Sequence, residues 1–275
     1  MVPRPRYPGN SPVASAPNEA HQHDLSAQTA GIIVQQAALI PGATVLEIGP
    51  GLGAITAALL AGGSTVLAIE RDPERVAHLR QRFAPALTSK QLTLMSGDAM
   101  RVIPTLHGTW SVVANPPFSL TAPLVRHWLL QSQPPQTITL VLQREAAEKL
   151  TGVSLGHTRS SILSHLTGVP AVALTLPRQA VTPPSRVDLA VWHHRRHARA
   201  PKPTALQAVD RLLAIAFAGP RTMQEALRGI ATGIQLRRQA SNHCWLLEDH
   251  PRTLTPAAWL DFAQLLATCD KLGAK

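Results

Sequence analysis

The chain has 275 residues, of which 45% are hydrophobic, and its formal net charge at pH 7 is +10. No stretch reaches the ~18 uninterrupted apolar residues that a membrane span needs, and the first residues lack the apolar segment of a secretory signal. These features argue against a membrane protein and a secreted one. We expect a cytoplasmic globular protein with a disordered, proline-rich tail over residues 1–20.

Positive charge is concentrated in the second half of the chain. Residues 1–150 carry a net charge of +2, whereas residues 151–275 carry +8. A strongly basic region of this kind is typical of proteins that bind a polyanion such as nucleic acid. The alternative is an arginine-rich surface that is only solvated.

Short apolar runs alternate with amphipathic segments between residues 44 and 150. The runs predicted as buried strands are Thr44–Ile48, Thr65–Ile69, Leu92–Met95, Trp110–Ala114 and Ile138–Leu142. The segments predicted as helices are 53–61, 73–83 behind the N-cap residue Asp72, 121–131, and a helix that ends at Lys149. This regular alternation predicts an α/β fold with a doubly wound sheet.

The alternation ends near residue 170. Apolar runs over 171–176 and 187–192 predict an antiparallel hairpin that closes the sheet. Helical periodicity over 206–218, 223–230 and 256–269 predicts a small helical domain at the C-terminus. We therefore expect an α/β domain over residues 21–195 and a helical domain over residues 204–275.

A basic segment bounded by proline, residues 193–203, connects the two predicted domains. It begins with the cluster His193-His194-x-x-His197. Because neither acidic nor cysteine ligands accompany these histidines, a solvated basic linker is the better interpretation than a metal site. We expect no metal.

The first predicted strand runs into a glycine-rich turn, Glu47-Ile48-Gly49-Pro50-Gly51-Leu52-Gly53. Glycines at this point allow positive φ and a close approach of the backbone to a ligand. A loop of this pattern suits a nicotinamide cofactor or another adenosine-containing cofactor, so by itself it leaves both open.

Acidic residues end the next two strands. Glu70 ends the second strand, where a carboxylate can accept both hydroxyls of a ribose. Asp98 follows Gly97 at the end of the third strand, where it can accept an N–H from an adenine amino group. The alternative for Asp98 is the N-cap of a helix.

The fourth strand ends in the tetrapeptide Asn115-Pro116-Pro117-Phe118. The side-chain oxygen of Asn115 and the carbonyl of Pro116 can each accept one N–H from a planar amino group. The two prolines fix φ and remove competing backbone donors, and Phe118 offers a face on which a purine can stack. This pattern indicates methyl transfer to an amino nitrogen.

The succession of Glu47–Gly53, Glu70, Gly97-Asp98 and Asn115–Phe118 resembles the ribosomal RNA adenine N6-dimethyltransferase family. That family comprises the Erm-type enzymes of macrolide–lincosamide–streptogramin B resistance and the 16S rRNA dimethyladenosine transferases. The similarity continues in Leu142–Ala147 and Val181–Asp188, and it covers roughly residues 21–192. It implies a Rossmann-like methyltransferase sheet.

Three positions depart from the family pattern. Asp24 stands where the family has an aromatic residue, within His21-Gln22-His23-Asp24-Leu25. Pro116 replaces the usual Ile or Leu of the tetrapeptide, and Val181 replaces an aromatic residue before the last strand. The double proline also occurs in enzymes that methylate adenine in DNA or glutamine in proteins.

The resemblance implies S-adenosylmethionine as the cofactor and ribosomal RNA as the partner of a monomeric enzyme. The residues expected to bind the cofactor are Gln22, His23, Gly49, Gly51, Glu70, Asp98, Ala99 and Asn115. Asn115, Pro116 and Phe118 would be catalytic. The positive second half would bind RNA, with the helical domain assisting, through Arg144, Arg159, Arg186, Arg195 and Arg196.

The first interpretation is an Erm-type enzyme that methylates N6 of an adenosine in 23S rRNA and so confers macrolide resistance. The second is a 16S rRNA dimethyladenosine transferase that acts in ribosome biogenesis. A DNA-adenine or protein-amide N-methyltransferase and a catalytically silent rRNA-binding factor are further alternatives. A dehydrogenase is disfavoured because no Tyr-Lys or His-Asp catalytic arrangement is apparent.

Overall fold

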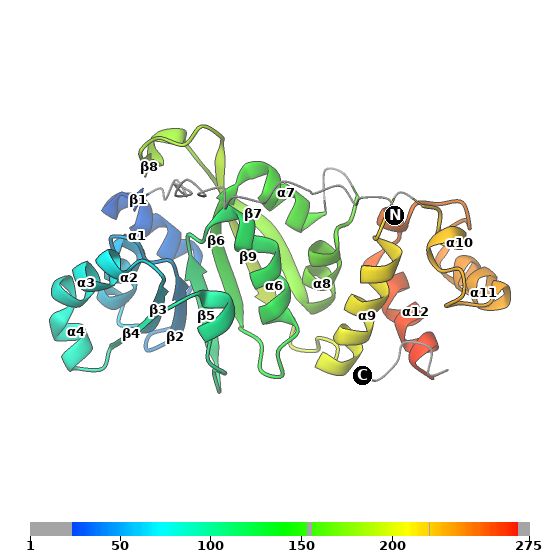
Figure 1. Ribbon diagram of the computed structural model, residues 1–275, viewed down its shortest axis with the longest axis horizontal. Coiled ribbons are helices and arrows are strands. Elements are labelled where there is room, and N and C mark those ends of the chain that lie inside the picture. Colours follow the sequence, from blue (N-terminus) through cyan, green and yellow to red (C-terminus); the bar gives the residue numbers. More distant parts are fainter. Residues whose placement is uncertain (1–23, 153–155, 220, 269–275) are drawn as a thin grey trace, which may run out of the picture.

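The computed structural model describes residues 24–152, 156–219 and 221–268. Its centre is a seven-stranded sheet in the order β4-β3-β2-β5-β6-β9-β7 (Figure 1). The strands are β2 (Thr44–Ile48), β3 (Thr65–Glu70), β4 (Leu92–Ser96), β5 (Trp110–Ala114), β6 (Thr137–Gln143), β7 (Gly168–Leu176) and β9 (Leu189–Arg196). The predicted doubly wound α/β sheet is confirmed.

The predicted closing hairpin is also confirmed. The strands β2 to β6 are parallel to one another, whereas β9 is antiparallel to both β6 and β7. β9 therefore lies between β6 and β7 rather than at the edge of the sheet. A separate two-stranded sheet pairs β1 (Asp24–Leu25) with β8 (Val181–Thr182).

Helices cover both faces of the sheet because side chains alternate along each buried strand. In β5, Trp110, Val112 and Ala114 belong to the core beneath α6 (Thr121–Leu129), whereas Val113 belongs to the opposite core. That opposite core is covered by α1 (Ala27–Gln36) and α2 (Ala54–Ala61). The sheet thus has a hydrophobic layer on each side.

The predicted start of α3 (Pro73–Arg82) is confirmed. The side chain of Asp72 accepts hydrogen bonds from the backbone N–H groups of Glu74 and Arg75, and proline occupies the first helical position. This N-cap with proline at N1 satisfies the free donors of the first turn. The short helices α4 (Ala84–Thr88) and α5 (Ala99–Val102) lie on either side of β4 in sequence.

The interpretation of residues 193–203 as a solvated linker is wrong at its beginning. β9 continues through Arg196, and the side chain of His194 is fully buried. Its Nε2 atom is 3.1 Å from both the Ser164 carbonyl oxygen and the Thr167 hydroxyl. These partners come from a helix that precedes β7, so local sequence does not reveal that a histidine can be buried here.

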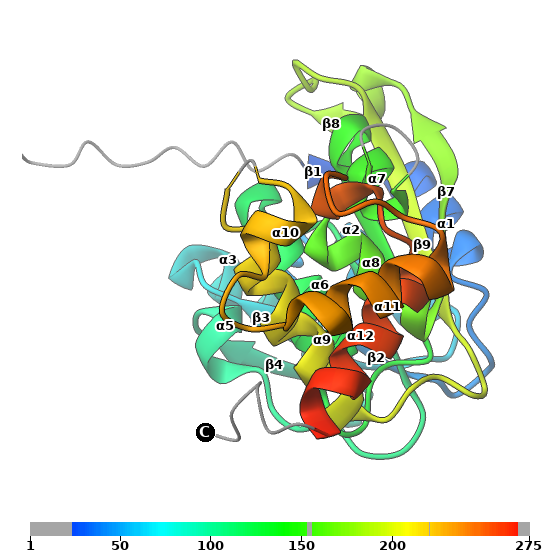
Figure 2. The ribbon, with the colours of Figure 1, turned by 90° about the vertical axis from the view of Figure 1, so that its right-hand side faces the viewer.

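The C-terminal helices are α9 (Pro203–Ala216), α10 (Met223–Ala226), α11 (Gly233–His243) and α12 (Pro256–Thr268). They gather at one end of the molecule, which is on the right in Figure 1 and faces the viewer in Figure 2. Among the described residues after α7, α8 (Arg159–Thr167) and α11 are α-helices that were not predicted, and the helix expected over 223–230 ends at Ala226. Before α7, α1, α4 and α5 were not predicted.

The helical part shares its hydrophobic core with the sheet. Ile162 and Leu166 of α8 belong to the same buried cluster as Leu213 of α9 and Phe262 of α12, and that cluster continues to β6. α8, which follows α7 (Arg144–Thr151), therefore joins the two parts. Within the described ranges, no helix is long and apolar enough to cross a membrane.

Candidate active site

The glycine-rich loop and the Asn-Pro-Pro-Phe loop meet at one edge of the sheet. β2 and β5 are adjacent parallel strands, and the order of the strands reverses between them. Loops after the carboxyl ends of such a pair form the usual ligand crevice of an open α/β sheet. A Cβ atom added to Gly49 would lie 3.8 Å from the backbone oxygen of Asn115, so the two loops are in contact.

A cavity of about 510 Å³ opens at this edge. The two loops form one wall, and residues 183–187, between β8 and β9, form another. The predicted residues that line it are Gly49, Gly51, Asn115, Pro116, Phe118 and Arg186. The volume is in the range of pockets that hold a cofactor or other small molecule.

Glu70 lies at the carboxyl end of β3, as predicted, and its carboxylate already holds backbone donors. Oε2 accepts from the N–H of Gly51 at 3.2 Å, and Oε1 accepts from Arg71 at 2.7 Å and Asp72 at 2.9 Å. The side chain is buried. Glu70 therefore supports the glycine-rich loop from below, and its bond to a cofactor ribose stays a prediction.

Asp98 has the N-cap role that was considered as its alternative. Its side chain accepts from the backbone N–H of Met100 at 2.9 Å, at the start of α5. Asp98, Ala99 and Glu70 do not belong to the lining of the cavity. Gln22 and His23 lie outside the described residues, so their predicted contacts with the cofactor stay predictions.

Glu47 is a buried carboxyl group in the wall of the cavity that sequence reasoning did not single out for chemistry. One oxygen accepts from the hydroxyl of Thr56 at 2.7 Å, while Oε1 has no hydrogen-bond partner among the described atoms. Burial raises the pKa of Glu47 to about 8. Burial therefore favours the protonated, neutral form of this side chain at pH 7.

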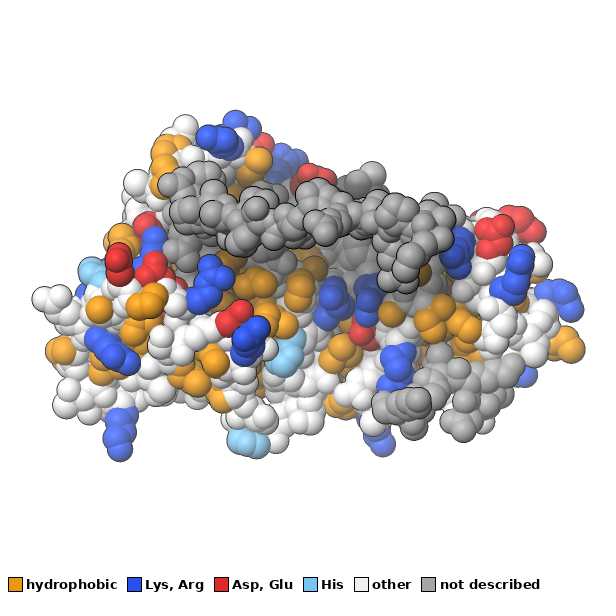
Figure 3. Space-filling view, viewed as in Figure 1, with side chains coloured by type: hydrophobic (Ala, Val, Ile, Leu, Met, Phe, Trp, Pro, Cys, Tyr) orange, Lys and Arg blue, Asp and Glu red, His pale blue; other side chains and the backbone are white. Residues whose placement is uncertain are grey.

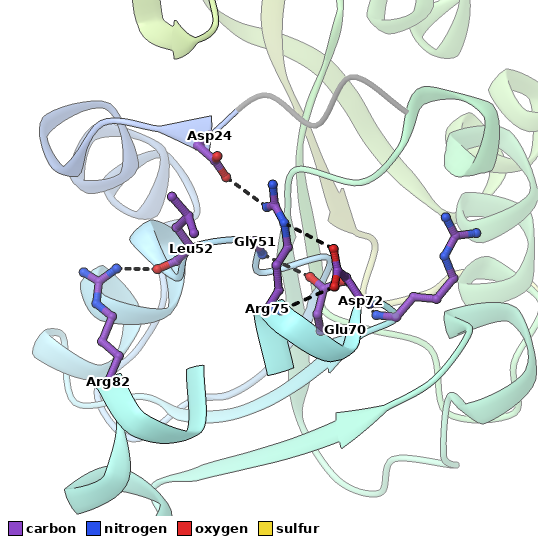
Figure 4. Close-up of polar contacts among 8 residues, drawn as sticks. Asp24, Gly51, Leu52, Glu70, Asp72, Arg75 and Arg82 are labelled. Carbon is purple, nitrogen blue, oxygen red and sulfur yellow. Dashed lines mark hydrogen bonds and ion pairs between the residues drawn. The ribbon is translucent and has the colours of Figure 1, made fainter. Parts of the chain in front are cut away.

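Asp24 and Arg75 form an ion pair in the cavity wall, and this contact was not predicted from the sequence. The Arg75 guanidinium reaches from the first turn of α3 over the glycine-rich loop to Asp24 in β1 (Figure 4). The Nη1–Oδ1 distance is 3.0 Å. Asp24 attracted attention only as a replacement for the family's aromatic residue, and nothing in the local sequence marked Arg75.

Three arginines line a hollow next to the cavity. Arg186 lines the cavity and also a neighbouring hollow of about 400 Å³, which Arg144 and Arg178 line as well. Arg144 pairs with Glu148, and Arg178 pairs with Asp188. Arg178 was not among the predicted RNA-binding residues.

The other predicted RNA-binding arginines are elsewhere. Arg159 pairs with Asp210 of α9 at 2.8 Å and so ties α8 to the helical part. Arg195 of β9 pairs in register with Thr137, the first residue of β6. Arg195 and Arg196 therefore lie at the amino-terminal end of β6, and the cavity lies at the other end of the parallel strands. On the described part of the face in Figure 3, Lys and Arg side chains are scattered over the sheet domain and the helices.

The groups that line the cavity between the ends of β2 and β5 fit a methyl-donating cofactor that contains adenosine. The cavity combines a backbone loop with positive φ at Gly49 and Gly51, a neutral carboxyl group, an ion pair and the amide of Asn115. Among the described residues, no group of three His, Cys, Asp or Glu is placed to hold a metal ion. Fold and site together define a Rossmann-like methyltransferase that depends on S-adenosylmethionine.

The chain belongs to the ribosomal RNA adenine dimethylase family, whose pattern it matches over residues 25–267. It is 37% identical over 205 residues to ribosomal RNA small subunit methyltransferase A of Dinoroseobacter shibae, covering 71% of this chain and 72% of the relative. The protein of the same name from Thermosynechococcus vestitus is 30% identical over 242 residues, covering 85% of this chain and 90% of the relative.

Two solved structures share the fold over most of the chain. The 23S rRNA methyltransferase ErmE superposes with a TM-score of 0.70 at 22% identity, covering 89% of this chain and 99% of ErmE. A dimethyladenosine transferase from Plasmodium falciparum superposes with a TM-score of 0.67 at 20% identity, covering 91% and 98%. At these identities, the likeness concerns the fold alone.

Proposed function

We propose that this protein transfers methyl groups from S-adenosylmethionine to N6 of an adenosine in small-subunit ribosomal RNA. The observation that carries the proposal is the contact between the glycine-rich loop and Asn115–Phe118 in one cavity of a chain that belongs to the adenine dimethylase family. The relatives at 30–37% identity support the small subunit as the target, because their printed names specify it.

In the proposed reaction, the protein positions an amine instead of activating a nucleophile. The cofactor supplies an electrophilic methyl group on a sulfonium. The oxygens of Asn115 and Pro116 would accept the two N6–H donors, which localises the nitrogen lone pair and directs it toward the methyl group. Positioning of this kind can lower a barrier by up to ~7–11 kcal/mol in the best cases.

The target adenine must leave its stack to enter the cavity, at a cost of a few kcal/mol. Phe118 lines the cavity beside Asn115, and stacking on its ring would offset part of that cost. Arg186 and Arg144 at the mouth would bind the phosphates on either side of the extruded base.

Methylation of 23S rRNA with macrolide resistance is the second candidate. It is favoured by Phe118 in the tetrapeptide and by Arg144-Glu145 after Gln143, which resemble Erm-type enzymes. The fold does not separate the two candidates, because ErmE and the dimethyladenosine transferase superpose about equally well.

Mass spectrometry of both rRNAs would separate these candidates. The gene would be expressed in cells that lack their own small-subunit dimethyltransferase, with Asn115→Ala as the inactive control. We expect N6-methylated adenosine in 16S rRNA and unchanged erythromycin susceptibility. Methylated adenosine confined to 23S rRNA, together with resistance, would establish the second candidate instead.

A further inference from the structure

The ion pair between Asp24 and Arg75 covers the second glycine of the loop. A Cβ atom added to Gly51 would lie 2.7 Å from Nη1 of Arg75 and 3.0 Å from Oδ1 of Asp24. The φ of Gly51 is 59°, so the position requires glycine for its backbone as well. Glu70 holds the N–H of Gly51 from the other side. One opposite-charge pair therefore lies on the backbone where a cofactor must approach.

Both charged groups extend from ordered elements and line the same cavity. Asp24 belongs to β1, which pairs with β8, and Arg75 belongs to the capped first turn of α3. The carboxylate of Asp72 lies 3.9 Å from Nε of Arg75 and holds its guanidinium from behind. The side chains of Arg75 and Asp24 retain 19% and 27% exposure, so ligand atoms can reach them.

The other ionisable groups that line the cavity are of a different kind. Glu47 is buried and neutral, and Arg186 lies at the mouth beside the second hollow. Among the described residues that line the cavity, Asp24 and Arg75 are thus the two that form an ion pair with each other. An α-amino acid zwitterion carries the complementary pair, one ammonium and one carboxylate.

We propose that Asp24 and Arg75 bind the amino-acid end of the cofactor. The guanidinium of Arg75 receives the α-carboxylate, and the carboxylate of Asp24 receives the α-ammonium. The zwitterion exchanges one internal ion pair for two charge-assisted contacts, so no charge is left without a partner. The assignment rests on the use of S-adenosylmethionine in the proposed function, and it does not depend on which rRNA is methylated.

Binding of two ligands that differ in the amino-acid end tests this assignment. S-adenosylhomocysteine carries the zwitterion, whereas 5′-methylthioadenosine lacks it. Calorimetry would give Kd for both ligands with the full-length protein and with Arg75→Met and Asp24→Asn. We expect each substitution to weaken S-adenosylhomocysteine at least tenfold and to change 5′-methylthioadenosine less than twofold.

Arg82→Met is the matched control. Arg82 lies on the same face of α3 and donates to the Leu52 carbonyl of the same loop, but it does not line the cavity. Its substitution should leave the ratio of the two Kd values unchanged. Circular dichroism of each variant would show that the fold is retained, and Asp24→Asn, which conserves shape, would replace Arg75→Met if the latter does not fold.

Three results would overturn the assignment. Equal loss of affinity for both ligands would mean that the ion pair only holds β1 and α3 together. Tighter S-adenosylhomocysteine binding by Arg75→Met would mean that the Arg75 side chain occupies the site and is displaced by the cofactor. Unchanged affinities would leave the pair without a role in binding. Each result is obtained without RNA, so rRNA methylation by the unaltered protein still decides the proposed function separately.

Discussion

At the scale of single residues, the proposed chemistry depends on two oxygen acceptors, the side chain of Asn115 and the carbonyl of Pro116. Asn115 and Pro116 directly follow β5 in the wall of the cavity, and the glycine-rich loop contacts Asn115. Pro116 and Pro117 have fixed φ, so the backbone sets the position of the Pro116 carbonyl oxygen. We expect the Asn115 side chain, which lines the cavity, to affect methyl transfer.

Asn115→Ala should lower kcat/KM for rRNA methylation on the order of 10²–10³-fold, because it removes one of the two groups proposed to align the amine. Binding of S-adenosylhomocysteine should stay within a few-fold of the unaltered protein. Transfer of labelled methyl groups and calorimetry measure the two quantities. Methylation at the original rate would remove Asn115 from the mechanism.

Glu47 should make stability depend on pH. Its pKa is raised from 4.5 to about 8 in the folded protein, so the folded state retains a proton that the unfolded chain loses. The stabilisation is complete below pH 4.5 and is lost as pH rises through about 8. Glu47→Gln keeps a neutral side chain and should remove this slope.

The comparison of Tm for the protein and for Glu47→Gln between pH 5 and 9 checks this expectation. At pH 9, the variant should be more stable by about 1–3 kcal/mol, because one unit of pKa shift corresponds to about 1.4 kcal/mol. Parallel curves of Tm against pH for the two proteins would mean that Glu47 ionises in the folded protein as it does in the unfolded chain.

At the scale of elements, the junction of α8, β7 and β9 depends on one close approach. A Cβ atom added to Gly168 would clash with the Arg195 carbonyl oxygen and would lie 2.5 Å from Nε2 of His194. Gly168 has an extended backbone, so the restriction is one of space. The same approach lets the buried His194 reach the last turn of α8.

Gly168→Ala should destabilise the protein by about 1–3 kcal/mol, because the added methyl group displaces β9 backbone that cannot move freely. Gly31→Ala in α1 is the matched control, since nothing lies within 4 Å of its added Cβ. That control should be neutral or stabilising by roughly 0.5–1 kcal/mol. Denaturant unfolding measures both, and equal stabilities would contradict the packing argument.

At the scale of the whole molecule, basic residues lie at both ends of the parallel strands. Arg186 lies at the mouth of the cavity, whereas Arg195 lies at the opposite end, next to the first residue of β6. In the proposed complex, an adenine extruded into the cavity would place the flanking phosphates near its mouth. Long-range attraction of RNA can use both ends, but close contacts are expected at one.

Arg186→Gln should weaken RNA binding about tenfold and reduce the slope of log K against log salt by about 1. Arg195→Gln, which makes the same change in net charge, should alter affinity less than twofold. Binding of an rRNA fragment measured at several salt concentrations checks both. Equal effects of the two substitutions would mean that RNA contacts the protein at both ends of the parallel strands.

Much of the architecture follows from patterns that are local in the sequence. β2 and β5 have the predicted bounds, and Asp72 caps α3 as expected, because burial period and capping chemistry act within a few residues. The placement of Gly49, Gly51 and Asn115 in one cavity also follows, since parallel strands end at the same edge. The local pattern failed at His194, whose partners lie about 30 residues earlier.

The sequence by itself determined the succession of the five parallel strands, the glycine-rich loop and the acceptor tetrapeptide, because each is encoded by neighbouring residues. Only the tertiary structure decided that Asp24 meets Arg75 across 51 positions of the chain, and that Arg186 lies at the cavity while Arg195 does not. Such meetings depend on where β1, α3 and β9 pack, and packing is set by the whole core rather than by any one segment.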